Sequence, residues 1–208
     1  MRKFLLPVLF LAIAFSFAIH HTKAEASEIT TINYVVKDGE TVNIIANRYQ
    51  MGSDEIGNVN PGVDINQLKT GQTIKIPDLS EIKSLQNEVI RLTNIERQKV
   101  GIAPLTYDWK LGRVARYKAN DMRDNNYFSH YSPTYGDPFV MMRDFGISFT
   151  KAGENIAARQ TTPEQVVQSW MNSDSHREAM LNPDYTRIGA GYSEGGYLGY
   201  YWVQMFAN

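Results

Sequence analysis

The pattern of apolar and polar positions divides the chain into two parts, and the first part ends with the strand-like segment TIKIP at residues 73–77. A β-branched run at residues 31–36 opens this part and predicts another strand. Between the two strands, a helix is predicted by the spacing of the apolar residues Val42, Ile45, Ala46 and Tyr49. A second short helix, capped by Ser53, is expected to end near Asn60-Pro61-Gly62. The predicted order is strand, helix, helix, strand.

The second part, residues 78–208, is expected to begin with helices and to end with strands. Asp78 is the expected N-cap of a helix whose apolar stripe consists of Ile82, Leu85, Val89 and Leu92. Further helices are predicted over residues 107–122, 137–146 and 162–173. Strands are expected at residues 186–193 and 197–207, with a turn between them. This order indicates an α+β fold in which helices pack on a small sheet.

The N-terminus has the layout of a secretory signal peptide over residues 1–26. Arg2 and Lys3 precede an apolar run at residues 4–19, and an A-x-A cleavage pattern comes directly before Ser27. A retained membrane anchor is the alternative, but the run is short and contains Pro7. We therefore expect an exported chain with no stable membrane anchor after cleavage.

The chain has no cysteine, which excludes a disulfide framework, a thiol lipid anchor and a Cys-based zinc site or nucleophile. This composition favours export from a Gram-positive bacterium. Cleavage removes three of the 21 basic residues and one of the 22 acidic residues, so 18 remain against 21 and the net charge becomes −3. Nothing in this charge attracts nucleic acid or anionic lipid over long range. The expected partners are neutral or mixed in charge.

Three ordered motifs in the first part resemble a LysM module, which we assign to residues 32–77. They are YVVKDGETV at residues 34–42, Asn60-Pro61, and TGQTIKIP at residues 70–77. LysM modules bind N-acetylglucosamine chains of peptidoglycan or chitin in a groove between the loop after the first strand and the loop before the last. By position, the resemblance implies that the glycan-binding residues are Gly39, Glu40, Thr41, Val42, Ile65, Asn66, Gln67 and Leu68. The alternative is a module that only spaces or packs.

The expected mature chain contains two histidines, His130 and His176, and the polar motif AGEN adds Glu154. Two imidazoles and a carboxylate are the minimum set for an open zinc site. Their separations of 24 and 22 residues match no local metal motif, so these side chains could equally organise loops by hydrogen bonding. The motif GYSEG at residues 191–195 is rejected as a serine nucleophile, because no histidine follows His176.

Five ordered motifs from about residue 78 to the C-terminus resemble the bacterial branch of the CAP superfamily, which we assign to residues 78–208. They are LTNIERQKVGIAPLTYD, YFSHYSP, AGENIA, WMNSDSHREAMLNPDYTRIGAGY and YYWVQMF. The superfamily includes cysteine-rich secretory proteins, antigen 5 and plant pathogenesis-related proteins. The resemblance implies an α-β-α sandwich with a broad cleft.

Many CAP proteins line this cleft with two histidines and two glutamates. The resemblance matches His130, Glu154 and His176 to three of these positions, whereas the fourth holds Ser173. One acid is therefore missing, and the catalytic residues, if the protein is an enzyme, stay unknown. If Ser173 or Ser175 caps a helix here, the helix dipole is expected to lower the pKa of His176.

Three functions remain open. The favoured one is a secreted, wall-associated binding protein whose LysM module holds peptidoglycan and whose CAP cleft binds a ligand or a protein partner. The second is a metal-dependent hydrolase of peptidoglycan or peptides, with zinc or another divalent metal on His130 and His176 and with Glu154 as general base. The third is a structural component of the wall or spore envelope.

Overall fold

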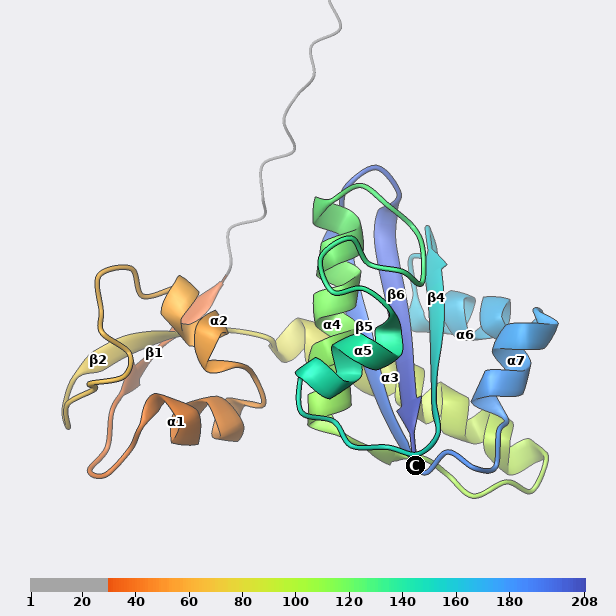
Figure 1. Cartoon of the computed structure of the whole chain (residues 1–208), viewed down its shortest axis with the longest axis horizontal. Helices are drawn as coiled ribbons and strands as arrows, with labels where there is room; N and C mark the ends of the chain where they lie inside the picture. Colours follow the sequence, from red (N-terminus) through yellow and green to blue (C-terminus); the bar gives the residue numbers. More distant parts are fainter. Residues whose placement is uncertain (1–29) are drawn as a thin grey trace, which may run out of the picture.

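The computed structural model describes residues 30–208, so the expected signal peptide lies outside the described residues. The first part consists of β1 (Thr31–Val35), α1 (Val42–Tyr49), α2 (Ser53–Asn58) and β2 (Thr73–Pro77). The two strands pair antiparallel along their whole length. The helices pack against this small sheet (Figure 1) around a core of Val36, Val42, Ile45, Ala46, Met51, Ile56, Ile74 and Ile76. The predicted order of elements is confirmed.

Two predicted helix caps in the chain are wrong by one residue. Gly52, and not Ser53, is the N-cap of α2, and the Gly52 amide donates to Glu55 Oε1 at 2.6 Å. Helix α3 (Ser80–Lys99) has Leu79 at its N-cap, while the Asp78 carboxylate accepts from the Ser80 amide at 3.0 Å. Since β2 ends at Pro77, only two residues join the two parts of the chain.

The second part is built on a four-stranded sheet with the order β3-β5-β6-β4. Its remaining elements are β3 (Thr106–Tyr107), α4 (Trp109–Asp124), α5 (Pro138–Asp144), β4 (Ala152–Ala158), α6 (Pro163–Met171), α7 (Asp174–Met180), β5 (Arg187–Gly195) and β6 (Gly199–Ala207). The expectation that strands come only at the end was wrong, because β4 precedes α6. Its sequence AGENIAA is rich in helix-forming Ala and Glu, and it becomes a strand by pairing with β6 along its whole length.

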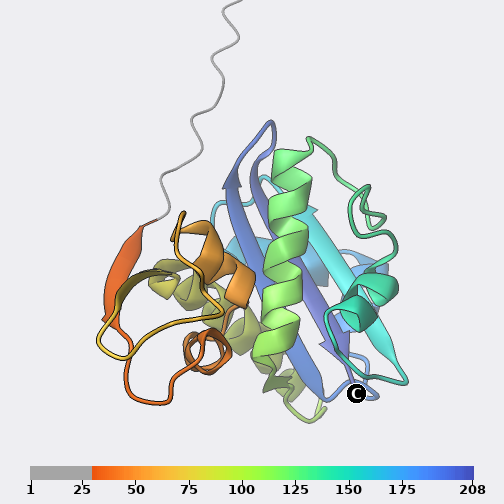
Figure 2. The same cartoon turned by 60° about the vertical axis from the view of Figure 1, so that its left-hand side comes forward.

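Helices cover both faces of this sheet, which confirms the α-β-α sandwich (Figures 1 and 2). Strand β6 is buried on both faces and divides two cores. On the face covered by α4 and α5 it contributes Tyr201, Val203, Met205 and Ala207. On the face covered by α3, α6 and α7 it contributes Trp202 and Phe206. Each helix presents its apolar stripe to one of these cores, as predicted for Val166, Val167 and Trp170 of α6.

Helix α4 lies unusually close to β5, and two glycines of β5 make this approach possible. A Cβ atom added at Gly189 would lie 2.6 Å from Leu111 Cβ, and one at Gly191 would lie 2.5 Å from the Arg116 amide nitrogen. Real Cβ atoms do not approach other atoms so closely. The glycines of the segment RIGAGY therefore allow α4 to pack directly on the sheet.

The two parts of the chain contact each other through α2 and α4. Asp54 and Glu55 of α2 face Arg113, Arg116 and Tyr117 of α4. The Arg113–Asp54 ion pair measures 2.8 Å, and Arg116 pairs with Glu55 while both side chains are nearly buried. We call this set of five residues the α2–α4 contact. It docks the first part onto the second.

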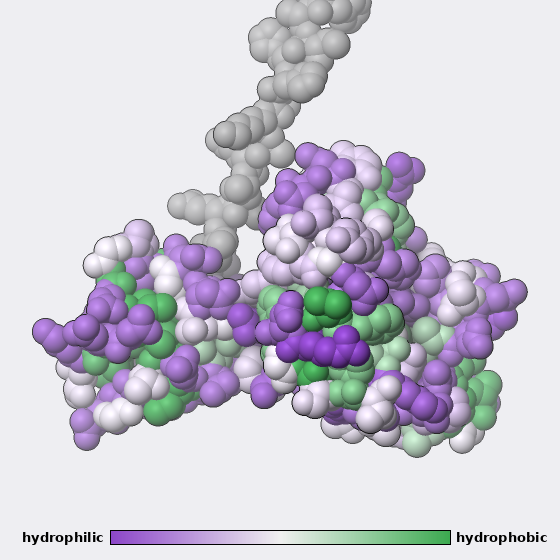
Figure 3. Space-filling model, in the orientation of Figure 1, coloured by the Kyte–Doolittle hydropathy of each residue, from purple (hydrophilic) through white to green (hydrophobic). Residues whose placement is uncertain are grey.

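The surface of both parts mixes polar residues with small apolar patches on the face shown in Figure 3. Within residues 30–208, none of the helices is both long and apolar enough to cross a membrane.

Candidate functional site

The two loops that the sequence assigns to glycan binding lie at the same end of the first part. The Gly71 amide donates to the Val36 carbonyl oxygen at 2.8 Å, and Thr70 Oγ1 donates to Asp38 Oδ1 at 3.4 Å. Of the eight predicted residues, the exposed ones are Gly39, Thr41, Asn66 and Gln67, and the half-buried ones are Ile65 and Leu68. These six residues present backbone, amide and apolar groups without a charge. Such a surface suits a neutral acetylated sugar.

The other two predicted glycan residues, Glu40 and Val42, turn inward. Val42 belongs to the core, and the Glu40 side chain is only 7% exposed. The Glu40 carboxylate accepts from the Lys37 amide at 2.9 Å and from the Tyr34 hydroxyl at 2.7 Å, and it pairs with Arg48. These donors, the Lys37 amide first, lower the pKa of Glu40 to about 2. Glu40 therefore stabilises the loop rather than lying on its surface.

In the second part, a loop at residues 125–135 carries His130, and buried polar side chains of α4 fix it. The Asp121 carboxylate accepts four hydrogen bonds from this loop, donated by Asn125, Tyr127, Ser132 and Thr134. Buried Lys118 donates from Nζ to the His130 carbonyl oxygen at 2.7 Å. The backbone on both sides of His130 is therefore held in place.

The structure brings His130 and Glu154 into direct contact. His130 Nδ1 lies 2.7 Å from Glu154 Oε1, with the imidazole 54% exposed and the carboxylate side chain 1% exposed. Burial raises the pKa of Glu154, whereas the contact with His130 and the charge of Lys118 oppose this rise. Its second oxygen, Oε2, is buried without a hydrogen-bond partner among the described residues. Glu154 is thus a poorly solvated acceptor that orients an exposed imidazole.

His176 lies at the start of α7, in the same region. Its Nδ1 atom is 2.8 Å from Ser173 Oγ, and its carbonyl oxygen accepts from Asn155 Nδ2 at 3.0 Å. Asn155 also donates to Gln204, whose amide in turn donates to Thr93. This buried chain of hydrogen bonds runs from α3 through β6 and β4, and it fixes the first turn of α7 beside Glu154.

The pKa of His176 is lowered, as the sequence predicted, but burial is the main cause and the nearby charge of His130 is the second. Ser173, one of the two expected cap residues, is the N-cap of α7, but its hydroxyl contacts the imidazole instead of the helix backbone. His176 joins the site through its carbonyl oxygen, which accepts from Asn155, the residue next to Glu154. We call His130, Glu154, Ser173 and His176 the His–Glu cluster.

The donors of this cluster do not complete a protein metal site. Among residues 30–208 there is no group of three or more His, Asp or Glu side chains arranged to hold a metal ion. Glu154 Oε1 is engaged by His130 Nδ1, as in carboxylates that orient a ligand from behind it. Two imidazoles are fewer than the three protein ligands of catalytic zinc sites. Zinc on His130 and His176 stays a prediction, and no chemistry is assigned to it.

Sequence reasoning missed two residues that support the cluster, namely Lys118 and Asp121. The sequence did contain a sign that Lys118 is buried, because Lys118 follows Val114 by four residues and so lies on the apolar stripe of α4. A lysine at a core position is unusual unless it is paired. Asn155 belongs to the candidate motif AGEN, but its supporting role could not be assigned because the strand that carries it was not predicted.

A sandwich of this topology preceded by a βααβ module defines a two-domain protein of the LysM and CAP types. The family described as "Cysteine-rich secretory protein family" (CAP) matches residues 90–206, which is more than half of the chain, and the chain belongs to this family. A LysM domain is recognised at residues 34–77. Despite the family's description, this chain contains no cysteine.

Bacterial relatives and solved structures agree with this assignment. The uncharacterized protein YkwD of Bacillus subtilis (strain 168) is 52% identical over 138 residues, which cover 66% of this chain and 52% of YkwD. An extracellular protein with an SCP domain from Bacillus anthracis is 32% identical, with a TM-score of 0.56, and the match covers 66% of this chain and 47% of that one. An outer surface protein of Borrelia burgdorferi, 24% identical with a TM-score of 0.55, shares the fold; the match covers 63% of this chain and 95% of that protein.

The chain spans about half of YkwD, and it spans 37% of another Bacillus subtilis relative, described as an uncharacterized membrane protein. LysM domains in general bind N-acetylglucosamine glycans such as peptidoglycan. At the family level, a LysM domain joined to a CAP domain is typical of secreted-type proteins that bind cell walls.

Proposed function

We propose that this protein is secreted and wall-associated, that its LysM module binds the N-acetylglucosamine glycan of peptidoglycan, and that its His–Glu cluster binds a polar ligand or a partner protein. One observation carries the second half of this proposal. The Nδ1 atoms of His130 and His176 are both engaged by protein groups, at 2.7 Å and 2.8 Å. Within the described residues, neither Nε2 atom makes a hydrogen bond, so both are available to a ligand.

The contact with Glu154 also supports a particular ligand chemistry. The Glu154 carboxylate accepts from Nδ1–H of His130 and leaves the Nε2 atom of that ring free for a ligand. Burial favours the neutral form of His176. A neutral imidazole can accept a hydrogen bond, so the cluster suits a ligand that carries hydroxyl or amide groups.

Binding is favoured over hydrolysis because the cluster lacks the third ligand of a catalytic metal site and has Ser173 where many relatives have an acid. A raised pKa nevertheless suits Glu154 to proton transfer, so the hydrolase remains the second candidate. A role as a structural component of wall or spore envelope is compatible with the same glycan binding.

Sedimentation with purified peptidoglycan tests the glycan half. The double variant Asn66→Ala/Gln67→Ala removes two exposed amides from the predicted groove without touching the core. We expect it to bind at least about tenfold more weakly than the wild type, which corresponds to about 1.4 kcal/mol. Asn87→Ala removes an exposed amide from α3 and is the matched control. Equal sedimentation of all three proteins would overturn the assignment of the groove.

The choice between binding and hydrolysis is tested with the double variant His130→Ala/His176→Ala. Release of soluble fragments from peptidoglycan by the wild type, lost in this variant and in Glu154→Gln, would establish the hydrolase. If the wild type releases none while the double variant loses its biological effect, the cluster is a binding site. If the double variant keeps the full effect, the two imidazoles are structural and the proposed cluster function fails.

A further inference from the structure

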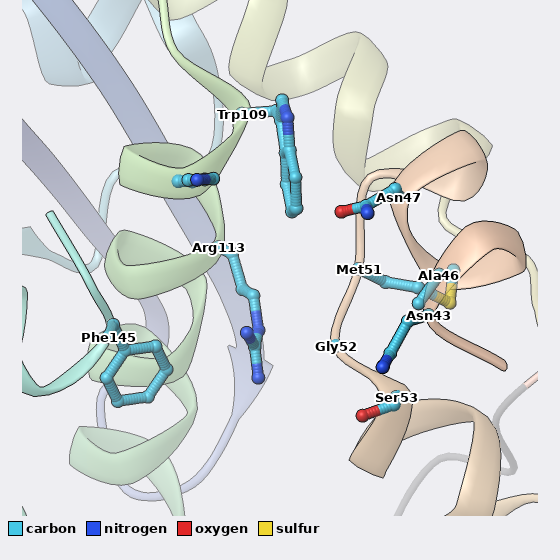
Figure 4. Close-up of a pocket in the computed structure, with 10 residues that line it drawn as sticks. Asn43, Ala46, Asn47, Met51, Gly52, Ser53, Trp109, Arg113 and Phe145 are labelled. Atoms are coloured by element: carbon cyan, nitrogen blue, oxygen red, sulfur yellow. The ribbon is translucent and has the colours of Figure 1, made fainter. Parts of the chain in front are cut away.

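A cavity of about 390 Å³ lies between the LysM module and the CAP domain, and its lining includes none of the predicted glycan residues and no residue of the His–Glu cluster. The module contributes residues of α1 and the start of α2, and the CAP domain contributes the first turns of α4 and the end of α5 (Figure 4). We call this cavity the seam pocket. It is lined by Asn43, Ala46, Asn47, Met51, Gly52, Ser53, Trp109, Lys110, Arg113 and Phe145.

The two walls of the seam pocket carry different chemistry. Figure 4 shows Trp109 and Arg113 projecting from α4 towards the side chains of Asn43 and Asn47 on α1. The two asparagines are four residues apart, so they share one face of α1. Behind them, the buried Ala46 and Met51 form an apolar floor. The pocket thus pairs a flat indole ring with two carboxamides.

Most of the polar groups in the pocket are not used by the protein itself. Within residues 30–208, no hydrogen bond involves the side chains of Asn43, Asn47 or Ser53, the Lys110 ammonium or the Trp109 indole N–H. Arg113 Nε is buried without a hydrogen-bond partner, since Glu55 Oε1 lies 3.6 Å away, beyond hydrogen-bond distance. A ligand with both donors and acceptors can therefore satisfy several groups at once.

The charges around the pocket nearly cancel. Lys110 and Arg113 line it, Asp54 pairs with Arg113, and Glu55 is shared between Arg113 and Arg116, so the three basic residues exceed the two acidic ones by a single charge. A balanced site does not favour a polyanion, but an aromatic ring beside amide groups suits a neutral sugar with its flat apolar face and its hydroxyl and acetamido groups.

We propose that the seam pocket is a second saccharide site, which binds an N-acetylated amino-sugar segment of the same polymer that the LysM loops hold. The ligand class rests on the proposed function, whereas the position of the site rests on the pocket itself. The α2–α4 contact keeps the two walls together, so this site exists only while the domains are docked. A glycan strand in the pocket would add to the affinity of the loops by multivalency.

Tryptophan fluorescence of the full chain gives a direct test. The sequence has three tryptophans, and Trp170 and Trp202 are each 1% exposed, which leaves Trp109 as the reporter of the pocket. Titration with N-acetylglucosamine tetramer should shift the emission to shorter wavelength, because the ligand covers the indole. The shift should be absent in Trp109→Phe. A saturating tetramer that leaves the wild-type emission unchanged would overturn the proposal.

Calorimetric titration with the same tetramer separates the two sites. We expect about tenfold weaker binding for Trp109→Ala and for Asn43→Ala/Asn47→Ala, with Asn87→Ala as control. If only the loop variant Asn66→Ala/Gln67→Ala loses affinity, the seam pocket is wrong and the LysM groove stands. If only the seam variants lose affinity, the pocket stands and the predicted groove is wrong. Absence of binding by the wild type would overturn both.

Discussion

The Nδ1 atom of His130 lies 2.7 Å from Oε1 of Glu154, although 24 residues separate the two in the chain. One belongs to a loop tied to α4, and the other belongs to β4 in the sheet. The sandwich brings them together because α4 packs on the sheet and its buried Lys118 holds the His130 carbonyl. The cluster therefore depends on packing that is distant from it in sequence.

Removal of the His130 imidazole should raise the pKa of His176. The charge of His130 is the second cause of its lowered pKa, after burial, so His130→Asn should recover only part of the shift. NMR titration of the His176 ring protons measures this change. Tyr131→Phe is the control, because it removes an exposed hydroxyl next to His130 in the sequence and leaves both imidazoles and Ser173 in place. An unchanged pKa of His176 in the His130 variant would mean that the two imidazoles do not share a site.

Acid should weaken the LysM module through Glu40. A carboxyl group whose pKa falls from 4.5 to about 2 on folding adds stability above the unfolded pKa, and this stability is lost as the pH falls from about 4.5 towards 2. Glu40→Gln should therefore destabilise the protein at pH 6 and have a smaller effect near pH 2. Urea unfolding at both pH values checks this. The control is Glu178→Gln, which removes an exposed carboxylate from α7, outside the LysM module.

The order of helices and strands in the LysM module could be predicted because the spacing of apolar residues within each segment was enough to identify it as a helix or a strand. Helix α1 ends at Tyr49, the last residue of its predicted apolar spacing, and the following residue, Gln50, has a left-handed backbone conformation. The same reasoning found α6 from Thr162 and Pro163, where Thr162 Oγ1 does accept from the Gln165 amide at 3.3 Å. Local signals of this kind do not require knowledge of the tertiary fold.

The support of the His–Glu cluster could not be predicted in the same way. Whether Glu154 faces solvent or the core depends on β4, and β4 is a strand only because β6 lies beside it. Likewise, Glu40 matches a family motif by position, but its burial depends on Arg48 and Tyr34, which are reached through the fold. The residue types in the sequence indicated the candidate chemistry, but the direction in which each side chain points could be known only from the tertiary contacts.

The two glycines of β5 should be among the most sensitive positions of the CAP domain. Gly191→Ala places a methyl group against the backbone of α4, which cannot move without disturbing the core, and we expect a loss of about 3 kcal/mol in the free energy of unfolding. Ala190→Gly, on the opposite face of the same strand, should cost about 1 kcal/mol. Urea unfolding of both variants checks the order. Equal stabilities would contradict the close approach of α4 and β5.

Docking of the two domains should respond to a single methyl group at Gly52. Its φ of −83° is accessible to alanine, so the substitution strains no backbone, but the new Cβ would lie 2.6 Å from Arg113 Cζ. Gly52→Ala should therefore displace the guanidinium from Asp54. Since this ion pair is partly exposed, we expect a loss of about 0.5–1 kcal/mol in docking, or about a two- to fivefold larger undocked population.

Glu55→Ala should have a larger effect on docking than Gly52→Ala. It leaves the nearly buried Arg116 without its partner, and breaking a buried pair costs about 3–5 kcal/mol. Small-angle scattering should show a larger radius of gyration in the order wild type, Gly52→Ala, Glu55→Ala, and proteolysis between Pro77 and Ser80 should accelerate in the same order. Asn58→Ala, at the exposed end of α2, is the matched control. If Glu55→Ala scatters like the wild type, the α2–α4 contact does not hold the domains together, and the two walls of the seam pocket are not held against each other by these charges.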